Sequence, residues 1–211
     1  MLGMLLTMLQ GSVVSLEVFF LTLLFSLPLG LPIAAGRMSK NCVIAQIANV
    51  FMLIIRGTPL MLQLIFVYFA PYHLFHLSYD RFTAAIIALS INYAAYFAEI
   101  YRGGIESIAQ GQYEAAKVLG YTKNQTFFRI ILPQVIKRIV PAMGNEVITL
   151  VKDTALVQVI GVAELLHVAQ TTSSRLFSTM PIFVAGVFYF VMNWAVSVAF
   201  RYIEKRLSYY R

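Results

Sequence analysis

Polar side chains that could interact with a charged solute recur at helical spacing inside an apolar stretch of the sequence. Asn92, Tyr96, Glu99 and either Arg102 or Gly103 fall at i, i+4, i+7 and i+10 or i+11, so they share one face of a 3.6-residue helix. A charge in the hydrocarbon of a bilayer costs about 2.5 to 3.5 kcal/mol on insertion scales, and it therefore usually faces a partner or an aqueous path. The spacing predicts that this face lines a hydrophilic passage.

A second stretch carries a similar set of polar side chains. Asn145, Glu146, Lys152, Asp153 and Thr154 lie close together in the sequence, and the separation of Glu146 from Asp153 corresponds to i and i+7 on a helix. Two polar faces on two helices are what a passage through a small membrane protein would require. A few helices of this length pack around a side-chain core rather than a pore, so we expect a second subunit to complete the passage.

Two explanations stay open for the charged members of these sets. Glu99 and Arg102 could form an ion pair at i and i+3 near a helix end, and Lys152 with Asp153 could form an interfacial helix cap. For Arg102 and Lys152, such a structural role and direct contact with a solute explain the sequence equally well. For Glu99 and Asp153, we favour the functional role.

The composition indicates that these helices cross a membrane. Hydrophobic residues make up 60% of the 211 residues and charged residues 12%, whereas soluble domains are roughly a quarter charged. A helix needs about 20 mostly apolar residues to span a bilayer. We predict an all-α membrane protein with five transmembrane helices in a single transmembrane domain, residues 1–211. The helices are expected near residues 12–36, 47–70, 82–102, 134–154 and 178–201.

The distribution of the basic residues predicts how the helices are oriented. The net charge is +7, and twelve of the sixteen Lys and Arg residues follow the first helix, the third helix or the last helix. Because cytoplasmic loops are enriched in Lys and Arg, the N-terminus is expected outside and the C-terminus in the cytoplasm. Nothing in the sequence resembles a base-stacking module, so we do not expect nucleic-acid binding. These basic residues are Arg37, Lys40, Arg102, Lys117, Lys123, Arg129, Lys137, Arg138, Arg201, Lys205, Arg206 and Arg211.

A polar segment at residues 103–129 separates the third predicted helix from the fourth. Its broken helical periodicity, with interruptions at Gly111 and Gly120, predicts short helices that project into the cytoplasm. A loop that only connected two helices could be far shorter. A further segment, residues 155–170, is too short and too charged for a sixth crossing, and it could be either interfacial or re-entrant.

The projecting segment resembles a known signature. Glu114-Ala115-Ala116, three residues, Gly120, nine residues and Ile130-Ile131-Leu132-Pro133 match the EAA motif of ABC-transporter permease subunits of the importer type at every fixed position. Other parts of the chain are similar to the permeases for polar amino acids. These parts are Arg56-Gly57-Thr58-Pro59-Leu60 with Gln63-Leu64, Asn92-Tyr93-Ala94-Ala95-Tyr96 with Glu99 and Arg102-Gly103-Gly104-Ile105, Gly144-Asn145-Glu146, and Lys152-Asp153-Thr154.

This resemblance implies partners and roles. The segment would be a coupling helix seated in a groove of a cytoplasmic ABC ATPase dimer, with Glu114, Ala115, Ala116 and Gly120 as the coupling residues. The chain has no G-x-x-x-x-G-K-[ST] phosphate-binding loop, so ATP and Mg would be bound by the ATPase and this chain would be no enzyme. We expect it to hold no cofactor or metal itself. A second permease subunit is expected, with a homodimer favoured over a heterodimer.

The resulting hypothesis is a permease subunit of an ATP-driven importer in a prokaryotic cell (inner) membrane. It would translocate a polar amino acid, with basic amino acids among the candidates, that an extracytoplasmic binding protein delivers. Arginine, lysine, histidine, glutamine and cystine all stay open as substrates. A passive channel or a regulatory membrane scaffold is the alternative, although neither explains the EAA motif. The residues predicted to line the passage are Thr58, Asn92, Tyr96, Glu99, Arg102, Glu146, Asp153 and Thr154.

Overall fold

The computed structural model describes residues 2–207, and this part of the chain is helical without a β-strand. The prediction of an all-α protein is confirmed. Met1 and residues 208–211, which include the predicted basic residue Arg211, lie outside the described residues. The helices are α1 (Leu2–Arg37), α2 (Cys42–Gly57), α3 (Leu60–Phe75), α4 (Arg81–Glu106), α5 (Gln110–Val118), α6 (Lys123–Gln125), a π-helix (Thr126–Ile131), α7 (Leu132–Asp153), a 3-10 helix (Thr154–Ile160), α8 (Leu165–Leu176) and α9 (Met180–Leu207).

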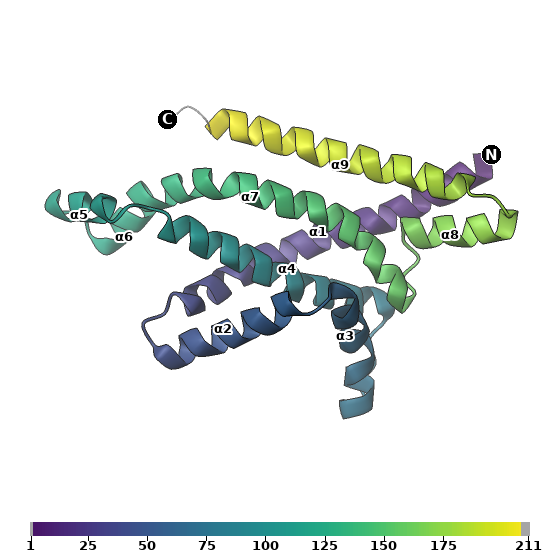
Figure 1. Cartoon of the computed structure of the whole chain (residues 1–211), viewed down its shortest axis with the longest axis horizontal. Helices are drawn as coiled ribbons and strands as arrows, with labels where there is room; N and C mark the ends of the chain where they lie inside the picture. The colour runs from purple at the N-terminus through teal and green to yellow at the C-terminus, as the bar shows by residue number, and fades with distance from the viewer. Residues whose placement is uncertain (1, 208–211) are drawn as a thin grey trace.

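The long helices lie roughly along the longest axis of the molecule (Figure 1). The connection between α1 and α2, the short helices α5 and α6, and the end of α9 lie at one end of this axis. The start of α1 and helix α8 lie at the opposite end. The segments that were predicted to be cytoplasmic from their basic residues are therefore grouped at the same end of the fold.

Within residues 2–207, three helices are long and apolar enough to cross a membrane, namely α1, α4 and α9. Helices α2 and α3 pass the same test together as one bent pair, which would make a fourth span. Helix α7 is not among these spans because five charged side chains lie within its bounds. A fifth crossing would therefore have to be α7, the charged helix that carries Glu146 and Asp153.

The region expected as one helix at residues 47–70 consists of α2 and α3, which meet at an angle of 108°. Thr58 takes an extended backbone conformation, as a residue before a proline usually does, and Pro59 has no N–H to continue the helix. The Thr58 hydroxyl donates to the Ile54 carbonyl at 2.8 Å, and the Gln63 amide donates to the Ile55 carbonyl at 2.7 Å. These side chains satisfy carbonyl groups that the broken helix leaves free.

Helices α1 and α4 form the centre of the fold. Their backbones approach closely at Gly30, where an added Cβ would lie 3.2 Å from both the Ala94 carbonyl oxygen and the Ala98 nitrogen. Glycine and alanine permit this approach, which is how helices commonly pack in membranes. Tyr93 and Phe97 of α4 are fully buried in the core beside them.

The two ends of the central pair differ from the predicted boundaries. Helix α1 begins at Leu2 rather than near residue 12, because Gly11 does not interrupt it and instead packs against α8, with Leu165 Cα 3.0 Å from where a Cβ would be. Helix α4 begins at Arg81, directly after its cap residue Asp80. The Asp80 carboxylate accepts hydrogen bonds from the Thr83 hydroxyl at 2.5 Å and the Thr83 N–H at 2.9 Å, and these bonds lower the pKa of Asp80.

The segment after α7 is not one continuous helix, because a short helix and a turn lead into α8. A 3-10 helix ends at Gly161, whose φ of 81° suits glycine, and α8 then begins after Glu164. The Glu164 side chain is fully buried and accepts hydrogen bonds from the His167 N–H at 2.7 Å and the Tyr189 hydroxyl at 2.6 Å. This carboxylate caps α8 and connects it to α9, which the sequence alone did not indicate.

Candidate substrate passage and coupling segment

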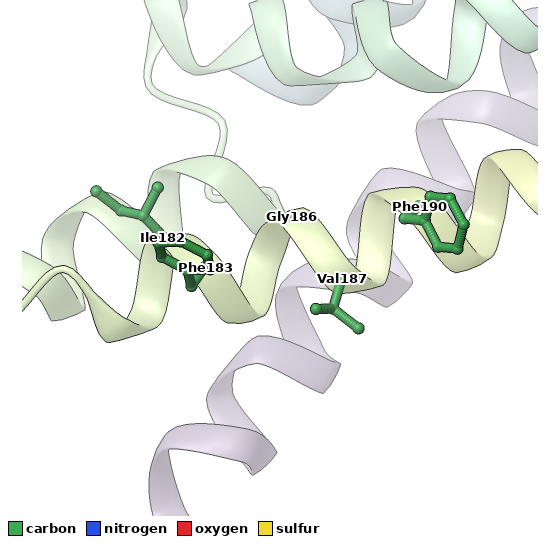
Figure 2. A pocket seen from close by; sticks show the side chains of 5 residues that line it. All are labelled: Ile182, Phe183, Gly186, Val187 and Phe190. Carbon is green, nitrogen blue, oxygen red and sulfur yellow. The ribbon is translucent and has the colours of Figure 1, made fainter.

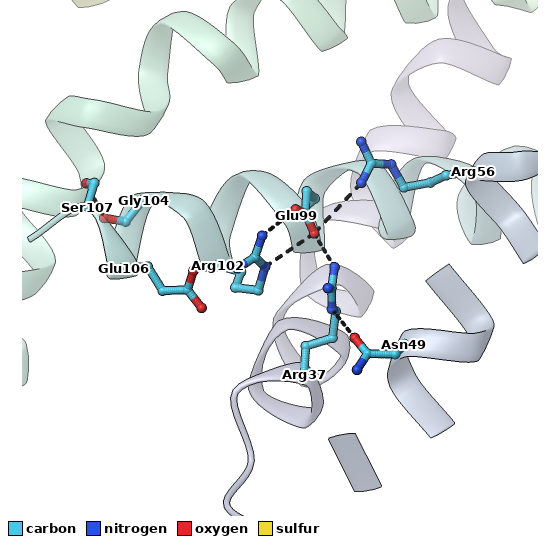
Figure 3. Close-up of polar contacts among 8 residues, drawn as sticks. All are labelled: Arg37, Asn49, Arg56, Glu99, Arg102, Gly104, Glu106 and Ser107. Carbon is cyan, nitrogen blue, oxygen red and sulfur yellow. Dashed lines mark hydrogen bonds and ion pairs between the residues drawn. The ribbon is translucent and has the colours of Figure 1, made fainter. Parts of the chain in front are cut away.

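The carboxylate of Glu99 joins the ends of three helices (Figure 3). One oxygen lies 2.5 Å from Arg102 of α4, and the other pairs with Arg37 at the end of α1. The second oxygen also lies 3.8 Å from Arg56 in the last turn of α2. The ion pair considered from the sequence for Glu99 and Arg102 is therefore present, and it belongs to a larger cluster that includes two arginines from other helices.

Two arginines of this cluster are engaged by further acceptors. Arg102 also pairs with Glu106, one turn later on α4, and Arg37 donates from Nε to Asn49 Oδ1 at 2.8 Å. Because the oxygens of Glu99 are occupied by guanidinium groups, this carboxylate holds α1, α2 and α4 together in the described state. Sequence analysis found Glu99 and Arg102 from their spacing on one helix, but Arg37 lies 62 positions away from Glu99.

Beside this cluster, α1, α2 and α4 enclose an open cavity of about 690 Å³. Arg56 lies along it, with its guanidinium 5.2 Å from the centre of the Tyr96 ring. Tyr96 was predicted to line a passage, and it does face this cavity. The residues around the cavity are Arg37, Gln46, Asn49, Val50, Met52, Leu53, Arg56, Gly57 and Tyr96.

Asn92 and Thr58, two of the predicted passage residues, are connected through a third side chain. The buried Asn92 amide donates to Gln63 Oε1 at 2.9 Å, and Gln63 Nε2 donates to Thr58 Oγ1 at 2.8 Å. Gln63 thereby joins α4 to the break between α2 and α3. Gln63 was part of the family-like sequence pattern but was not predicted as a site residue, since an isolated glutamine gives no spacing signal.

Helix α7 places Asp153 against α4. The Tyr93 hydroxyl donates to Asp153 Oδ2 at 2.8 Å, and Tyr93 is 2% exposed. Glu146 is half-buried two turns earlier on α7, and it lies within electrostatic range of Arg56 and Asp153. Glu146 has no hydrogen bond or ion pair within residues 2–207. The structure therefore brings Glu146 and Asp153 to the side of α7 that faces α4, with the Glu146 carboxylate unoccupied.

Thr154, the remaining predicted passage residue, is 1% exposed and its hydroxyl donates to the Val151 carbonyl at 2.8 Å. This hydrogen bond belongs to the turn where α7 continues into the 3-10 helix. Thr154 therefore has a local structural role in the described state. Its neighbour Asp153, and not Thr154, carries the polar group that reaches α4.

The outward faces of α7 and α9 have opposite character. The exposed residues of α7 recur at helical spacing and are mainly small or polar, whereas the outward side of α9 is apolar (Figure 2). An apolar face suits lipid hydrocarbon, and an exposed polar stripe at membrane depth needs protein or water beside it. The stripe on α7 comprises Arg138, Pro141, Ala142, Asn145, Thr149 and Lys152. The face of α9 comprises Ile182, Phe183, Gly186, Val187 and Phe190.

The predicted coupling segment contains a short helix with a defined end. Helix α5 ends at Val118, and Gly120 follows with a φ of 76°. The Gly120 N–H donates to the Lys117 carbonyl at 3.1 Å, and the Tyr121 N–H donates to the Ala116 carbonyl at 3.0 Å. This pair of bonds is a Schellman motif, which requires a left-handed residue at that point. The glycine of the EAA pattern therefore ends the helix and turns the chain.

The other residues of the pattern divide between surface and interior. Glu114 and Ala115 are exposed, whereas Ala116 is 1% exposed and packs within this chain. Val118 and Leu119 are 87% and 72% exposed just before the turn. The segment thus offers a carboxylate, a small residue and two apolar side chains to a partner, and Ala116 supports it from beneath.

Long apolar helices with charged side chains between them are the features of a helical membrane protein. Residues 26–209 match the family described as the binding-protein-dependent transport system inner membrane component, and the chain belongs to this family. The prediction of a permease subunit of an ABC transporter is confirmed. The chain is accordingly a transport subunit and not an enzyme.

Relatives and a solved structure agree with this assignment. The chain is 37% identical over 203 residues to the glutamine transport system permease protein GlnP of Escherichia coli (strain K12), with 95% of this chain and 93% of the relative covered. It is 35% identical over 201 residues to the arginine transport system permease protein ArtQ of Bacillus subtilis (strain 168), at 95% and 92% coverage. A crystal structure of an amino acid ABC transporter with histidines has a TM-score of 0.88 and 37% identity, with 95% of this chain and 94% of that chain covered.

Proposed function

We propose that this chain is the membrane-spanning permease subunit of an ATP-driven ABC importer that translocates a polar amino acid. The named relatives transport glutamine and arginine, and the structural neighbour is an amino acid transporter, which supports this class of substrate. The family description implies delivery by a binding protein, which would be extracytoplasmic. A cytoplasmic ATPase dimer would supply ATP and Mg.

The proposed topology has five crossings in a prokaryotic cell (inner) membrane. Helices α1, α4 and α9, the bent pair of α2 and α3, and the charged helix α7 would each cross once, with the N-terminus outside and the C-terminus in the cytoplasm. The grouping of the basic segments at one end of the fold supports this orientation (Figure 1). A second permease subunit, preferably another copy, would cover the polar stripe of α7, because that stripe is unsuited to lipid.

The observation that carries the proposal is the Glu146 carboxylate, which has no hydrogen bond or ion pair within residues 2–207 and lies two turns before Asp153 on a charged helix of a transport protein. An amino acid carries an ammonium group, and two carboxylates facing α4 would favour it electrostatically along its path. Asn92 and Thr58 would contribute polar groups through Gln63, and Tyr96 would line the neighbouring cavity. Glu99 and Arg102 would shape the passage by fixing the helix ends.

ATP binding would act through the coupling segment. Closure of the two ATPase subunits would move Glu114, Ala115 and Gly120 of each permease copy, while Ala116 transmits the movement to the bundle. The cavity would then alternate between outward and inward access, since each state of the ATPase contacts one arrangement of the permease better than the other.

Substitution of the two carboxylates tests the passage. The variants Glu146→Gln and Asp153→Asn keep the side-chain shape but remove the charge, and we expect ATP-driven uptake to fall at least about tenfold, the equivalent of one lost charge-assisted hydrogen bond. The matched control is Glu204→Gln in the last turns of α9. Uptake at the wild-type rate by both variants, in correctly assembled complexes, would remove these residues from the passage.

A further inference from the structure

We infer that the guanidinium of Arg56 binds the carboxylate group of the translocated amino acid, in the cavity enclosed by α1, α2 and α4. This inference rests on the proposed function. It adds a binding group for the substrate carboxylate, the second charged group of an amino acid after its ammonium group. Arg56 lies in the last turn of α2, directly before the break that separates α2 from α3. A change in the angle between these helices would therefore move Arg56 relative to the rest of the bundle.

Arg56 differs from the other two arginines near Glu99 in how its donors are used. Arg37 and Arg102 are 21% and 25% exposed, and each of them donates to a carboxylate and to a further acceptor. Arg56 is 40% exposed, and its distance of 3.8 Å from Glu99 is longer than a charge-assisted hydrogen bond of about 2.7 to 2.9 Å. Within residues 2–207 it has no hydrogen bond, so the donors of its guanidinium are available.

The balance of charge also favours an anion beside Arg56. Arg37, Arg56 and Arg102 share the two carboxylates of Glu99 and Glu106, and Glu106 pairs with Arg102. Within residues 2–207, one positive charge of this cluster therefore lacks a close partner, and it belongs to Arg56, which lines the open cavity together with Arg37. Figure 3 shows Arg56 at the edge of the cluster around Glu99. Glu146 of α7 also acts on Arg56 electrostatically, although the two groups form no ion pair. An incoming carboxylate would supply the missing partner at close range.

The setting of Arg56 suits a carboxylate in shape as well as charge. The Tyr96 ring lies 5.2 Å from the guanidinium carbon and holds this planar group by a cation–π contact. A fixed planar guanidinium can form two parallel hydrogen bonds to a carboxylate, which a lysine cannot. With Glu146 within electrostatic range, the same region would favour the ammonium group of the amino acid at the opposite side.

Arg102 and Lys152 are the two basic side chains for which the sequence left direct contact with a solute open. Arg102 is engaged by Glu99 and Glu106, so binding a substrate there would require breaking existing ion pairs. Lys152 is exposed on the outward stripe of α7, away from the cavity that Arg56 lines. Of these three basic residues, Arg56 is the one that both has available hydrogen-bond donors and lines the cavity.

The inference can be tested by equilibrium binding to the purified complex of permease and ATPase in nanodiscs, without the binding protein. The probes are radiolabelled L-arginine, L-histidine and L-glutamine, each compared with its decarboxylated amine: agmatine, histamine and 4-aminobutanamide. The variants are Arg56→Gln, Arg56→Lys and the control Arg175→Gln, which removes an exposed arginine of α8. Thermal denaturation establishes that each variant is folded.

We expect Arg56→Gln to raise the Kd of the bound amino acid at least about tenfold, Arg56→Lys to raise it less, and Arg175→Gln to leave it unchanged. The decarboxylated amine should bind the wild type and Arg56→Gln equally weakly, since it lacks the group that Arg56 recognises. An unchanged Kd for the amino acid would overturn the inference. An equal loss for the amino acid and its amine would also overturn it, because Arg56 would then only support the structure.

A lipid phosphate is another oxyanion that could reach this arginine, so the measurement is repeated with and without phosphatidylglycerol. If Arg56→Gln changes the Kd of the amino acid only when phosphatidylglycerol is present, Arg56 acts through the lipid and the inference is wrong. Uptake with ATP and the binding protein is measured on the same preparations. If the wild type takes up the amino acid normally and Arg56→Gln changes neither binding nor uptake, only the carboxylate site is rejected. If the wild type takes up no amino acid, the proposed function is rejected.

Discussion

The hydroxyl group of Tyr93 in α4 donates a hydrogen bond to Asp153 at the end of α7, with 2.8 Å between the two oxygens. Tyr93 is buried in the core, so this bond fixes the position of a carboxylate from within the packed interior. Asp153 keeps a second oxygen for other partners. The contact therefore connects the rigid centre of the fold to a charged group of the proposed passage.

Removal of the Tyr93 hydroxyl should affect transport more than folding. Tyr93→Phe keeps the ring in the core and removes one hydrogen bond, so we expect a loss of about 1 kcal/mol in stability. Asp153 would then be free to rotate, and ATP-driven uptake should fall several-fold. The control Tyr202→Phe changes an exposed tyrosine of α9. Thermal denaturation and uptake by proteoliposomes measure the two effects, and normal uptake by Tyr93→Phe would argue against a fixed Asp153.

Neutralisation of Glu99 should loosen the junction of α1, α2 and α4. In Glu99→Gln, three guanidinium groups lose their shared carboxylate, and we expect a destabilisation of about 1 to 3 kcal/mol in this partly exposed cluster. Glu106→Gln is the control, since Glu106 is 53% exposed and its ion pair among the described residues is with Arg102 alone. A melting temperature of Glu99→Gln no lower than that of Glu106→Gln would show that Glu99 does not hold the helices together.

Gln63 is expected to stabilise the break between α2 and α3. Gln63→Leu would leave the buried Asn92 amide and the Ile55 carbonyl without this partner, at a cost of about 1 to 3 kcal/mol. Gln63→Glu keeps an acceptor for Asn92 but loses the donor to Ile55, so it should have a smaller effect on stability. Hydrogen exchange of the amides in α2 and α3 measures the local effect, and equal protection in the wild type and Gln63→Leu would contradict this role.

The coupling segment should tolerate substitution at Gly120 only by residues that accept a positive φ. We expect Gly120→Asp to uncouple ATP hydrolysis from uptake, because the strained turn would displace α5, and Glu114→Lys to weaken binding of the ATPase. Gly120→Asn should retain more coupling, since asparagine adopts left-handed conformations more readily than most residues.

Gly111→Asp is a matched control for these coupling variants, because Gly111 has no positive φ and no atom within 4 Å of an added Cβ. The ratio of amino acid transported to ATP hydrolysed is the measurement. A wild-type ratio for both Gly120→Asp and Glu114→Lys would exclude the coupling role.

The sequence was informative where the signal is local. Hydrophobic run length predicted an all-α protein, and the residues from 2 to 207 are helical without a strand. The spacing from Glu114 to Gly120 indicated a short helix with a glycine end, and a Schellman motif occurs there. Each of these features depends on residues within a few positions of one another.

The contacts that the sequence did not reveal are long-range. Arg37 reaches Glu99 over 62 positions, and Tyr93 reaches Asp153 over 60. Glu164, a single acid near an apolar run, gave no sign that it would be fully buried with hydrogen bonds to α8 and α9. Such pairs depend on which helices pack together, and residue spacing within one helix carries no information about that.

The most direct test of the central claim is amino acid uptake by proteoliposomes that contain this permease, its ATPase and its binding protein, with ATP and Mg supplied on the ATPase side. We predict uptake of one or a few polar amino acids against a concentration gradient, which requires ATP hydrolysis and stops when the ATPase is omitted. Uptake that runs only down the gradient and continues without ATP would identify a passive channel and contradict the account.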